Sequence, residues 1–111
     1  MNPDKLAKGM CRPLSAGTAP LALAQIDAGL AQLPGWEHQD GAIGKTFSFR
    51  NYAETMAFAN AVAWIAGRED HHPDMLVGYD KCRISYRTHS IGGISENDLI
   101  CAAKIEVLCR I

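Results

Sequence analysis

The chain has 111 residues, of which 48% are hydrophobic and 21% are charged, and its formal net charge at pH 7 is −1. These values are typical of a single globular domain with its own hydrophobic core. They exclude the concentrated basic surface that binds nucleic acid, and no stretch approaches the ~20 apolar residues of a membrane-spanning helix.

The N-terminal part is expected to contain an arm followed by a helix. Prolines and glycines interrupt residues 1–17, so we expect a loose N-terminal arm before a single domain over residues 18–111. Thr18 can cap a helix, and apolar residues recur at steps of three and four as far as Leu33. Pro34, which a glycine follows, ends this predicted helix.

Strand signals follow this helix. Residues 36–39 and 43–50 flank the pair Asp40-Gly41, which is a typical hairpin turn. Phe47 and other apolar residues alternate with polar ones, so one face of this ribbon is apolar and the other is polar. We therefore predict a first β-hairpin here.

A second helix is predicted from Asn51, which has capping-box spacing to Glu54, to about Ala66. Its residues are apolar nearly all round, which indicates burial on more than one side. We expect this helix to lie across the sheet as the central element, with part of its far side covered by another helix or another subunit.

A second hairpin is predicted over residues 74–88, with a two-residue turn at Asp80-Lys81. With this turn Val77 faces Ile84, and the pairs on their side of the ribbon are all apolar. A slip by one residue would mix apolar and polar side chains on both faces, so the sorting of side chains supports the register.

The last helix is predicted to begin at Ser95, with Glu96 and Asp98 in a first turn where acidic side chains suit the helix dipole. The order of elements is therefore helix, two strands, helix, two strands, helix. Helices that cover one face of a small antiparallel sheet form an α+β sandwich. We predict an α+β fold with a four-stranded antiparallel sheet and three helices on one face.

The second hairpin is expected to bring three histidines together. Extending its register places His72 opposite His89, where facing Cβ atoms lie ~4.5–5.5 Å apart if the ladder reaches that far. His71 adjoins His72 on the incoming loop. The three imidazoles should therefore converge at the open end of the hairpin.

Three kinds of site are compatible with such a cluster. Three histidines suit a catalytic zinc ion, but adjacent histidines point apart in an extended chain, and neither an HxH nor an HxxxH spacing is present. The imidazoles can alternatively cap a loop by hydrogen bonding. In the third kind of site they transfer protons, because imidazole gives or takes a proton near neutrality. The residues alone lead no further than an acid–base site for a small molecule.

The four cysteines, at positions 11, 82, 101 and 109, form no CxxC unit, which excludes a zinc ribbon or a thioredoxin-type motif. The N-terminal residues lack the continuous apolar segment of a signal peptide. We therefore expect a cytoplasmic protein with reduced thiols that act as small apolar side chains or lie exposed.

The histidine region resembles the pterin-4a-carbinolamine dehydratase family. The family's core pattern is a His-His-Pro run, an aromatic residue six positions later, a histidine ten positions further on and an aspartate nine positions after that. The stretches "EDHHPD", "THSIGGISENDLI" and "LPGWE" fit as well, and the resemblance covers roughly residues 18–110. The residues that carry the pattern here are His71, His72, Pro73, Tyr79, His89 and Asp98.

The resemblance implies an activity and an assembly. The activity is dehydration of 4a-hydroxytetrahydrobiopterin to the quinonoid dihydropterin, which recycles the pterin used by aromatic amino acid hydroxylases. Such a hydroxylase is therefore a possible partner. Neither a metal nor an organic cofactor is implied. The implied assembly is a homodimer or homotetramer, formed through strand edges and helices.

The resemblance also assigns roles to residues. His71 and His89 are the candidates for proton transfer at the C4a hydroxyl, and His72 would hold the pterin, so that all three belong to the catalytic site. The expected substrate-binding residues are Asp70, Pro73, Thr88 and Asp98.

The chain departs from the family pattern at Gly67. Family members usually have an acidic residue at this position, four residues before the first histidine, and the nearest acids here are Glu69 and Asp70. An alternative function is therefore that of a non-catalytic member, which oligomerises with another protein as animal relatives do with a transcription factor. Since no proposed proton carrier is missing, we expect an active enzyme.

Overall fold

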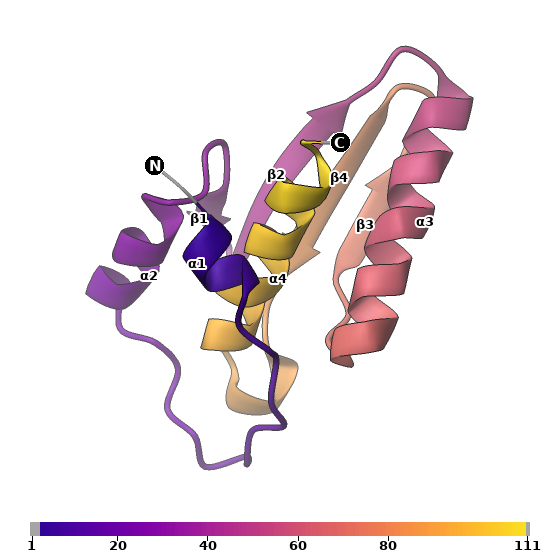
Figure 1. The fold of residues 1–111 in the computed structure, drawn as a ribbon. Coiled ribbons are helices and arrows are strands. Elements are labelled where there is room, and N and C mark those ends of the chain that lie inside the picture. Colours follow the sequence, from indigo (N-terminus) through magenta and orange to yellow (C-terminus); the bar gives the residue numbers. More distant parts are fainter. Residues whose placement is uncertain (1–2, 111) are drawn as a thin grey trace.

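The computed structural model describes residues 3–110 of the chain. Four helices, four strands and a 3₁₀ turn follow one another within this range (Figure 1). They are α1 (Asp4–Ala7), α2 (Leu23–Leu30), β1 (Glu37–Gln39), β2 (Ala42–Ser48), α3 (Tyr52–Glu69), β3 (Asp74–Val77), β4 (Lys81–Tyr86), η1 (His89–Ile91) and α4 (Glu96–Leu108).

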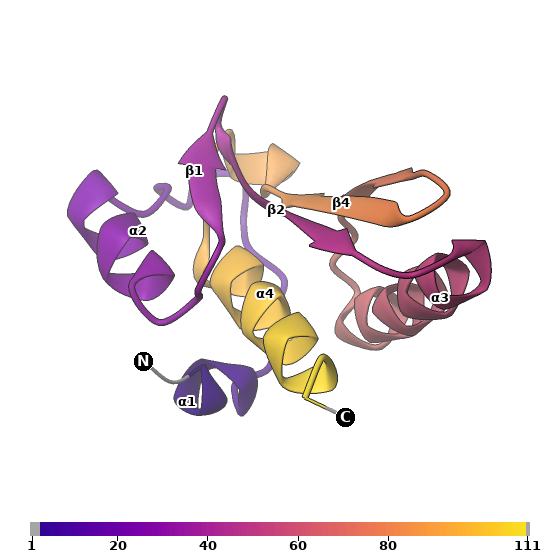
Figure 2. The same ribbon diagram turned by 90° about the horizontal axis from the view of Figure 1, so that it is seen from above.

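The four strands form one antiparallel sheet in the order β1-β2-β4-β3. The helices lie on one face of this sheet, as the view from above shows (Figure 2). The predicted α+β fold, with a four-stranded antiparallel sheet covered by helices on one face, is therefore confirmed. None of the helices within residues 3–110 has the length and apolar character needed to cross a bilayer.

The first hairpin forms at the predicted turn. Asp40 and Gly41 both have positive φ angles, 54° and 76°, and Gln39 pairs with Ala42 on either side of them. Two consecutive residues with positive φ are the requirement of a type I′ turn, whose twist matches that of the flanking strands.

The second hairpin forms, but its predicted register is wrong by two residues. Val77 pairs with Cys82 rather than with Ile84, because the turn is at Tyr79-Asp80 rather than at Asp80-Lys81. The backbone N–H of Gly78 donates to the carbonyl oxygen of Lys81 (2.8 Å) and closes this turn.

Contacts from distant parts of the chain select this turn. Phe49 donates its backbone N–H to the carbonyl oxygen of Asp80 (2.8 Å). The hydroxyl of Thr55 donates to the backbone carbonyl oxygen of Tyr79 (2.9 Å). A shift of two residues keeps each side chain on its own face of a strand. The side-chain sorting used for the prediction therefore could not distinguish the two registers.

The central helix is α4, and the prediction that residues 51–66 hold this place is wrong. Helix α4 lies between α3 and the N-terminal helices (Figure 2), and eight of its residues are buried. In α3 the side chain of Trp64 is 65% exposed, and several alanines also face the solvent. The predicted cap at Asn51 is confirmed, since its side chain accepts a hydrogen bond from the N–H of Glu54 (2.9 Å).

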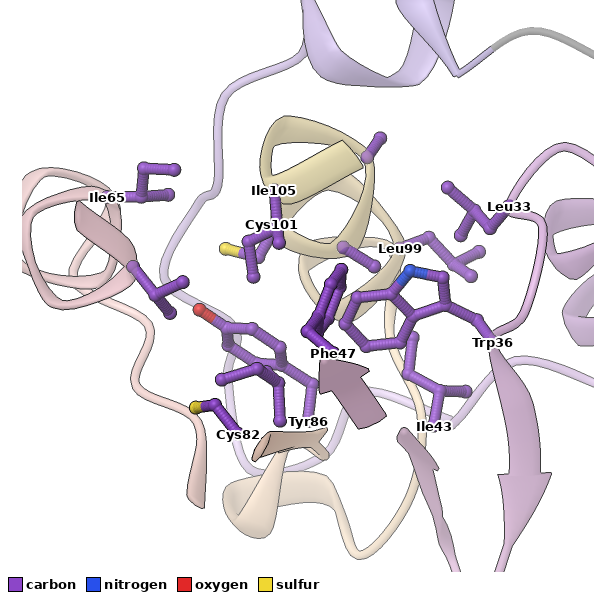
Figure 3. Packing of buried hydrophobic residues seen from close by; sticks show 14 of the residues in the cluster. Leu33, Trp36, Ile43, Phe47, Ile65, Cys82, Tyr86, Leu99, Cys101 and Ile105 are labelled. Carbon is purple, nitrogen blue, oxygen red and sulfur yellow. The ribbon is translucent and has the colours of Figure 1, made fainter. Parts of the chain in front are cut away.

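The hydrophobic core lies between the sheet and α4 (Figure 3). Phe47 of β2 packs its ring edge against Trp36 and lies against Phe58 of α3. The side chains of Cys82, Ile84 and Tyr86 point from β4 into this core and are fully buried. Strand β4 therefore forms part of the sheet face against which the helices pack.

Residues 1–17 were expected to form a loose arm, but within the described residues the segment 3–8 contains helix α1 and packs against the domain. Helix α1 lies along α4, and the ammonium group of Lys104 donates a hydrogen bond to the carbonyl oxygen of Ala7 (2.7 Å). The predicted helix start at Thr18 is also wrong. Helix α2 begins at Leu23, and the side chain of Gln25 accepts the N–H of Ala22 (2.8 Å).

Candidate active site

The site is organised around Asp98, which is completely buried in the first turn of α4. Its Oδ2 atom accepts hydrogen bonds from the backbone N–H of Ser95 (2.9 Å) and from the hydroxyl of Thr88 (2.9 Å). The first of these bonds completes the capping box Ser95-x-x-Asp98, and the helix N-terminus favours a negative charge at this place. The position of the Asp98 carboxylate therefore follows from the capping box that begins α4.

The other carboxylate oxygen of Asp98 holds His71. Its Oδ1 atom lies 2.6 Å from Nε2 of His71, whose side chain is only 13% exposed. One carboxylate thus caps a helix with one oxygen and orients an imidazole with the other. This arrangement fixes the Nε2 atom of His71 relative to the helix.

The end of α3 delivers His71 to this position. Asp70 adopts a left-handed conformation (φ 50°, ψ 43°) and terminates the helix. The backbone N–H of His71 donates to the carbonyl oxygen of Ala66 (3.1 Å), and the backbone N–H of Asp70 donates to the carbonyl oxygen of Gly67 (3.4 Å). These two bonds are those of a Schellman motif, which turns the chain sharply at a helix end.

Tyr86 supports the imidazole from β4. Its ring stacks on that of His71, with centroids 5.1 Å apart and an interplanar angle of 19°. Its hydroxyl donates to the backbone carbonyl oxygen of His71 (3.2 Å). His71 is therefore held by contacts from α4 and β4 in addition to its own helix end.

The surroundings of His71 change its affinity for a proton. Burial lowers the pKa of His71, but the hydrogen bond and the charge of Asp98 raise it, and Cys101 and Asp70 add to the increase. The net result is a pKa above the ordinary 6.5. Because an imidazole with a raised pKa holds its proton up to a higher pH than a free imidazole does, it is suited to donate that proton to a leaving group.

His72 and His89 have a different environment. Both are exposed, and no hydrogen bond or ring contact joins either of them to His71 in the part of the chain that the structure describes. The strand ladder ends at Asp74 and Ser85, so neither histidine belongs to it. The expected pairing of His72 with His89 across the hairpin is therefore wrong.

The segment between β4 and α4, which contains His89, nevertheless lies at the same end of the molecule as the C-terminal end of α3 (Figure 1). It begins the 3₁₀ turn η1, inside a loop whose base is closed by backbone hydrogen bonds between Thr88 and Gly93 (2.9 and 3.4 Å). The same Thr88 donates its hydroxyl to Asp98. The base of the loop that carries His89 is thereby joined to the carboxylate that holds His71.

The structure brings His71, Thr88 and Asp98 together, but it buries the polar atoms of the last two. Thr88 is 7% exposed and Asp98 is 0% exposed, and both side chains are hydrogen-bonded inside the protein. Of the other expected substrate-binding residues, Asp70 is exposed and Pro73 is half-buried beside the histidine pair. No group of three His, Cys, Asp or Glu side chains within residues 3–110 is arranged to hold a metal ion.

Ser95 and Tyr86 are part of this arrangement, although neither was predicted from the sequence to belong to the site. The signal for Ser95 was present, because a serine three positions before an aspartate is a capping box, and a buried capping acid can bind a second partner. No local signal marks Tyr86. Its contact with His71 depends on how the end of α3 meets β4.

Comparison with known proteins identifies the family. The model of the family described as pterin 4 alpha carbinolamine dehydratase matches residues 19–108. The chain is 57% identical over 101 residues to a protein of Nitrosomonas europaea, with 90% of this chain and 89% of that protein covered. It is 55% identical over 108 residues to a protein of Nitrosospira multiformis, with 97% and 96% covered. Both carry the name "Putative pterin-4-alpha-carbinolamine dehydratase".

Two solved structures share the fold. The transcriptional coactivator/pterin dehydratase from Brucella melitensis superimposes with a TM-score of 0.77 at 28% identity, covering 80% of this chain and 97% of the other. A pterin dehydratase-like protein, identified as a RuBisCO assembly factor in the alpha-carboxysome, superimposes with a TM-score of 0.55 at 24% identity, covering 66% and 84%. The family match across most of the domain and the identities above 50% lead to one conclusion: the chain belongs to the pterin-4-alpha-carbinolamine dehydratase family.

Proposed function

We propose that this protein dehydrates a 4a-hydroxytetrahydropterin to the quinonoid dihydropterin and water by histidine acid–base catalysis. The observation that carries the proposal is the hydrogen bond between His71 and the buried Asp98, at the two ends of the family's sequence pattern. The reaction needs an acid for the departing hydroxyl and a base for the proton on the adjoining ring nitrogen. No electron acceptor is required, because the C–O bond breaks with its electron pair and a C=N bond forms.

His71 is the proposed acid, since its pKa is raised and its Nε2 atom is fixed by Asp98. It gives its proton to the hydroxyl at C4a, and water leaves. His89 is the proposed base, and His72 the residue that holds the pterin. Both are exposed and therefore accessible to a ligand.

Asp98 and Thr88 act through His71 in this proposal. Their buried oxygens are already engaged with protein groups, so they position the imidazole and the η1 loop rather than contact the pterin. Asp70 and Pro73, which flank the histidine pair, remain proposed substrate contacts.

The test is a dehydratase assay with carbinolamine generated by a hydroxylase. We expect His71→Ala and His89→Ala each to lower the rate by roughly 10²–10⁴-fold, the usual contribution of a general acid or base. His38→Ala is the matched control, because His38 is an exposed residue of β1 in the first hairpin. Less than a threefold loss in both site variants would contradict the assignment.

A second candidate function is that of a non-catalytic partner protein. Two observations favour it: glycine replaces the usual acid at position 67, and one protein that shares the fold is a RuBisCO assembly factor. If the wild-type protein leaves the decay of the carbinolamine unchanged in the same assay, this second function replaces the first.

A homo-oligomer is also part of the proposal. Strand β3 is an edge of the sheet, and its Met75, Leu76 and Val77 side chains are 37%, 74% and 36% exposed. An apolar sheet edge of this kind offers unpaired backbone groups to another chain. Sedimentation analysis should find a dimer or tetramer that Leu76→Lys weakens, whereas a wild-type monomer at micromolar concentration would refute this part. The hydroxylase partner and the cytoplasmic location stay predictions from the sequence.

A further inference from the structure

Two cysteines that are far apart in the sequence lie side by side behind the site. The Sγ atoms of Cys11 and Cys101 are 3.5 Å apart. Cys101 is a fully buried residue of α4, and Cys11 is a half-buried residue of the segment that follows α1. A disulfide bond has an S–S length of ~2.05 Å, so a small movement of the N-terminal segment would bring the sulfurs to bonding distance.

Hydrogen bonds on both sides hold Cys11 in this place. Its backbone N–H donates to Oε1 of Glu69 at the end of α3 (2.9 Å). The next residue, Arg12, donates its N–H to Oδ1 of Asn97 (3.1 Å) and accepts from Nδ2 of the same side chain (2.7 Å). The short distance between the two sulfurs is therefore maintained by hydrogen bonds on both sides of Cys11.

A small oxidant can reach the pair from one side. Cys11 lines a cavity of about 390 Å³, together with Met10, Arg68, Glu69 and Lys104. The hydrogen bond from Cys11 lowers the pKa of the Cys101 thiol, in spite of burial, which raises it. In a singly ionised pair the negative charge therefore resides on Cys101, behind the accessible Cys11.

We propose that Cys11 and Cys101 are a redox-sensitive thiol pair, which a peroxide converts reversibly into a disulfide. The Cys11 thiol first passes its proton to the Cys101 thiolate across the hydrogen bond that joins the two sulfurs, because only a thiolate attacks a peroxide. The Cys11 thiolate attacks one oxygen of hydrogen peroxide, the O–O bond breaks, and Cys11 becomes a sulfenic acid while the departing hydroxide takes a proton from the solvent and leaves as the first water. The Cys101 sulfur then attacks the sulfur of Cys11, the S–O bond breaks, and the departing hydroxyl takes the Cys101 proton and leaves as the second water. The two thiols are oxidised by two electrons and one peroxide is reduced to two waters.

The disulfide would have two consequences. It would fasten the N-terminal segment covalently to α4, and closing so long a loop restricts the unfolded chain strongly. It would also alter the surroundings of Tyr86, whose hydroxyl points toward Cys101 (Figure 3) and whose ring stacks on His71. The thiol chemistry itself is independent of the dehydratase reaction.

The experiment treats the purified full-length protein with excess hydrogen peroxide and then with dithiothreitol. Mass spectrometry of tryptic digests should find peptides 9–45 and 88–104 linked after oxidation and separate after reduction, because these peptides contain Cys11 and Cys101. The free thiol count should fall from four to two. The melting temperature should rise by about 5 °C or more.

Serine variants make the test specific. Cys11→Ser should abolish both the linked peptide and the rise in melting temperature, and it keeps a hydrogen-bond donor of similar size at a partly exposed position. Cys109→Ser, at the exposed cysteine after α4, should leave both readouts as in the wild type. Oxidation that yields only sulfinic acids, or a disulfide that involves Cys109, would overturn the proposal.

Discussion

His71 and His89 are both candidates for proton transfer, yet their surroundings in the structure differ. His71 is hydrogen-bonded to Asp98, stacked on Tyr86 and largely buried, whereas His89 lies exposed at the start of η1. His71 therefore has a fixed position and a raised pKa, whereas the side chain of His89 is accessible to solvent. In the proposed reaction, the fold would therefore position the acid, His71, before a ligand arrives, whereas the base, His89, would be oriented together with the ligand.

The largest effect is expected from a variant that removes the carboxylate charge of Asp98, which holds His71 in place. Asp98→Asn keeps the shape but places an amide where the carboxylate accepts hydrogen bonds from His71 and Ser95. We expect the turnover rate to fall on the order of 10²-fold. The free energy of unfolding should fall by about 1–3 kcal/mol, because buried donors lose their acceptor.

Asn51→Ala is the control for this variant. It removes the cap of α3, costs about 1 kcal/mol of stability and touches no residue of the site. Steady-state kinetics and urea denaturation of both variants separate the two effects. Equal losses of turnover in both variants would mean that Asp98 only stabilises the fold.

A smaller effect is expected in the pH dependence of the free energy of unfolding, to which the raised pKa of His71 contributes. The pKa of His71 is raised in the folded protein, so the protonated His71–Asp98 pair stabilises the fold fully below the unfolded value of about 6.5. This stabilisation is lost as the pH rises through the higher folded pKa. Unfolding measured between pH 5 and pH 9 should therefore show a decline above about pH 6.5, and this decline should be absent in Asp98→Asn. A wild-type stability that rises over this range would contradict the raised pKa.

The smallest expected effect concerns Gly67, near the end of α3. A Cβ atom there would meet no neighbour within 4 Å, so a side chain fits. Gly67→Ala should stabilise the protein by about 0.5–1 kcal/mol, since glycine is unfavourable inside a helix. Gly67→Glu also restores the acid that is usual in the family, and we expect it to raise turnover less than tenfold above the alanine variant. Equal turnover of the two variants would show that this acid is dispensable here.

The two hairpins show how far the sequence could predict the fold. The turn at Asp40-Gly41 is encoded locally, because both residues tolerate positive φ, and the prediction was confirmed. The second turn depends on hydrogen bonds from Phe49 and Thr55, which no local pattern reveals. The apolar alternation fixed the faces of β3 and β4 but not their register, so the expected meeting of His72 and His89 did not follow.

The central helix was misjudged for a related reason. Helix α3 is rich in alanine, which counts as apolar in a pattern but is also a strong helix former that is tolerated on the surface. Helix α4 buries polar residues, among them Asn97 and Asp98, whose partners lie in other elements. The pattern of His71, His89 and Asp98 was visible in the sequence, but the stacking of Tyr86 required the assembled fold.

The double use of Asp98 has a consequence for how this protein can evolve. Natural active sites commonly trade stability for activity, so that a substitution can improve one at the expense of the other. Here one oxygen of the carboxylate starts α4 and the other aligns the imidazole. A lineage that lost the proposed chemistry at His71 would still lose stability on replacing this acid, so selection for stability alone would favour keeping the carboxylate from which that chemistry could be regained.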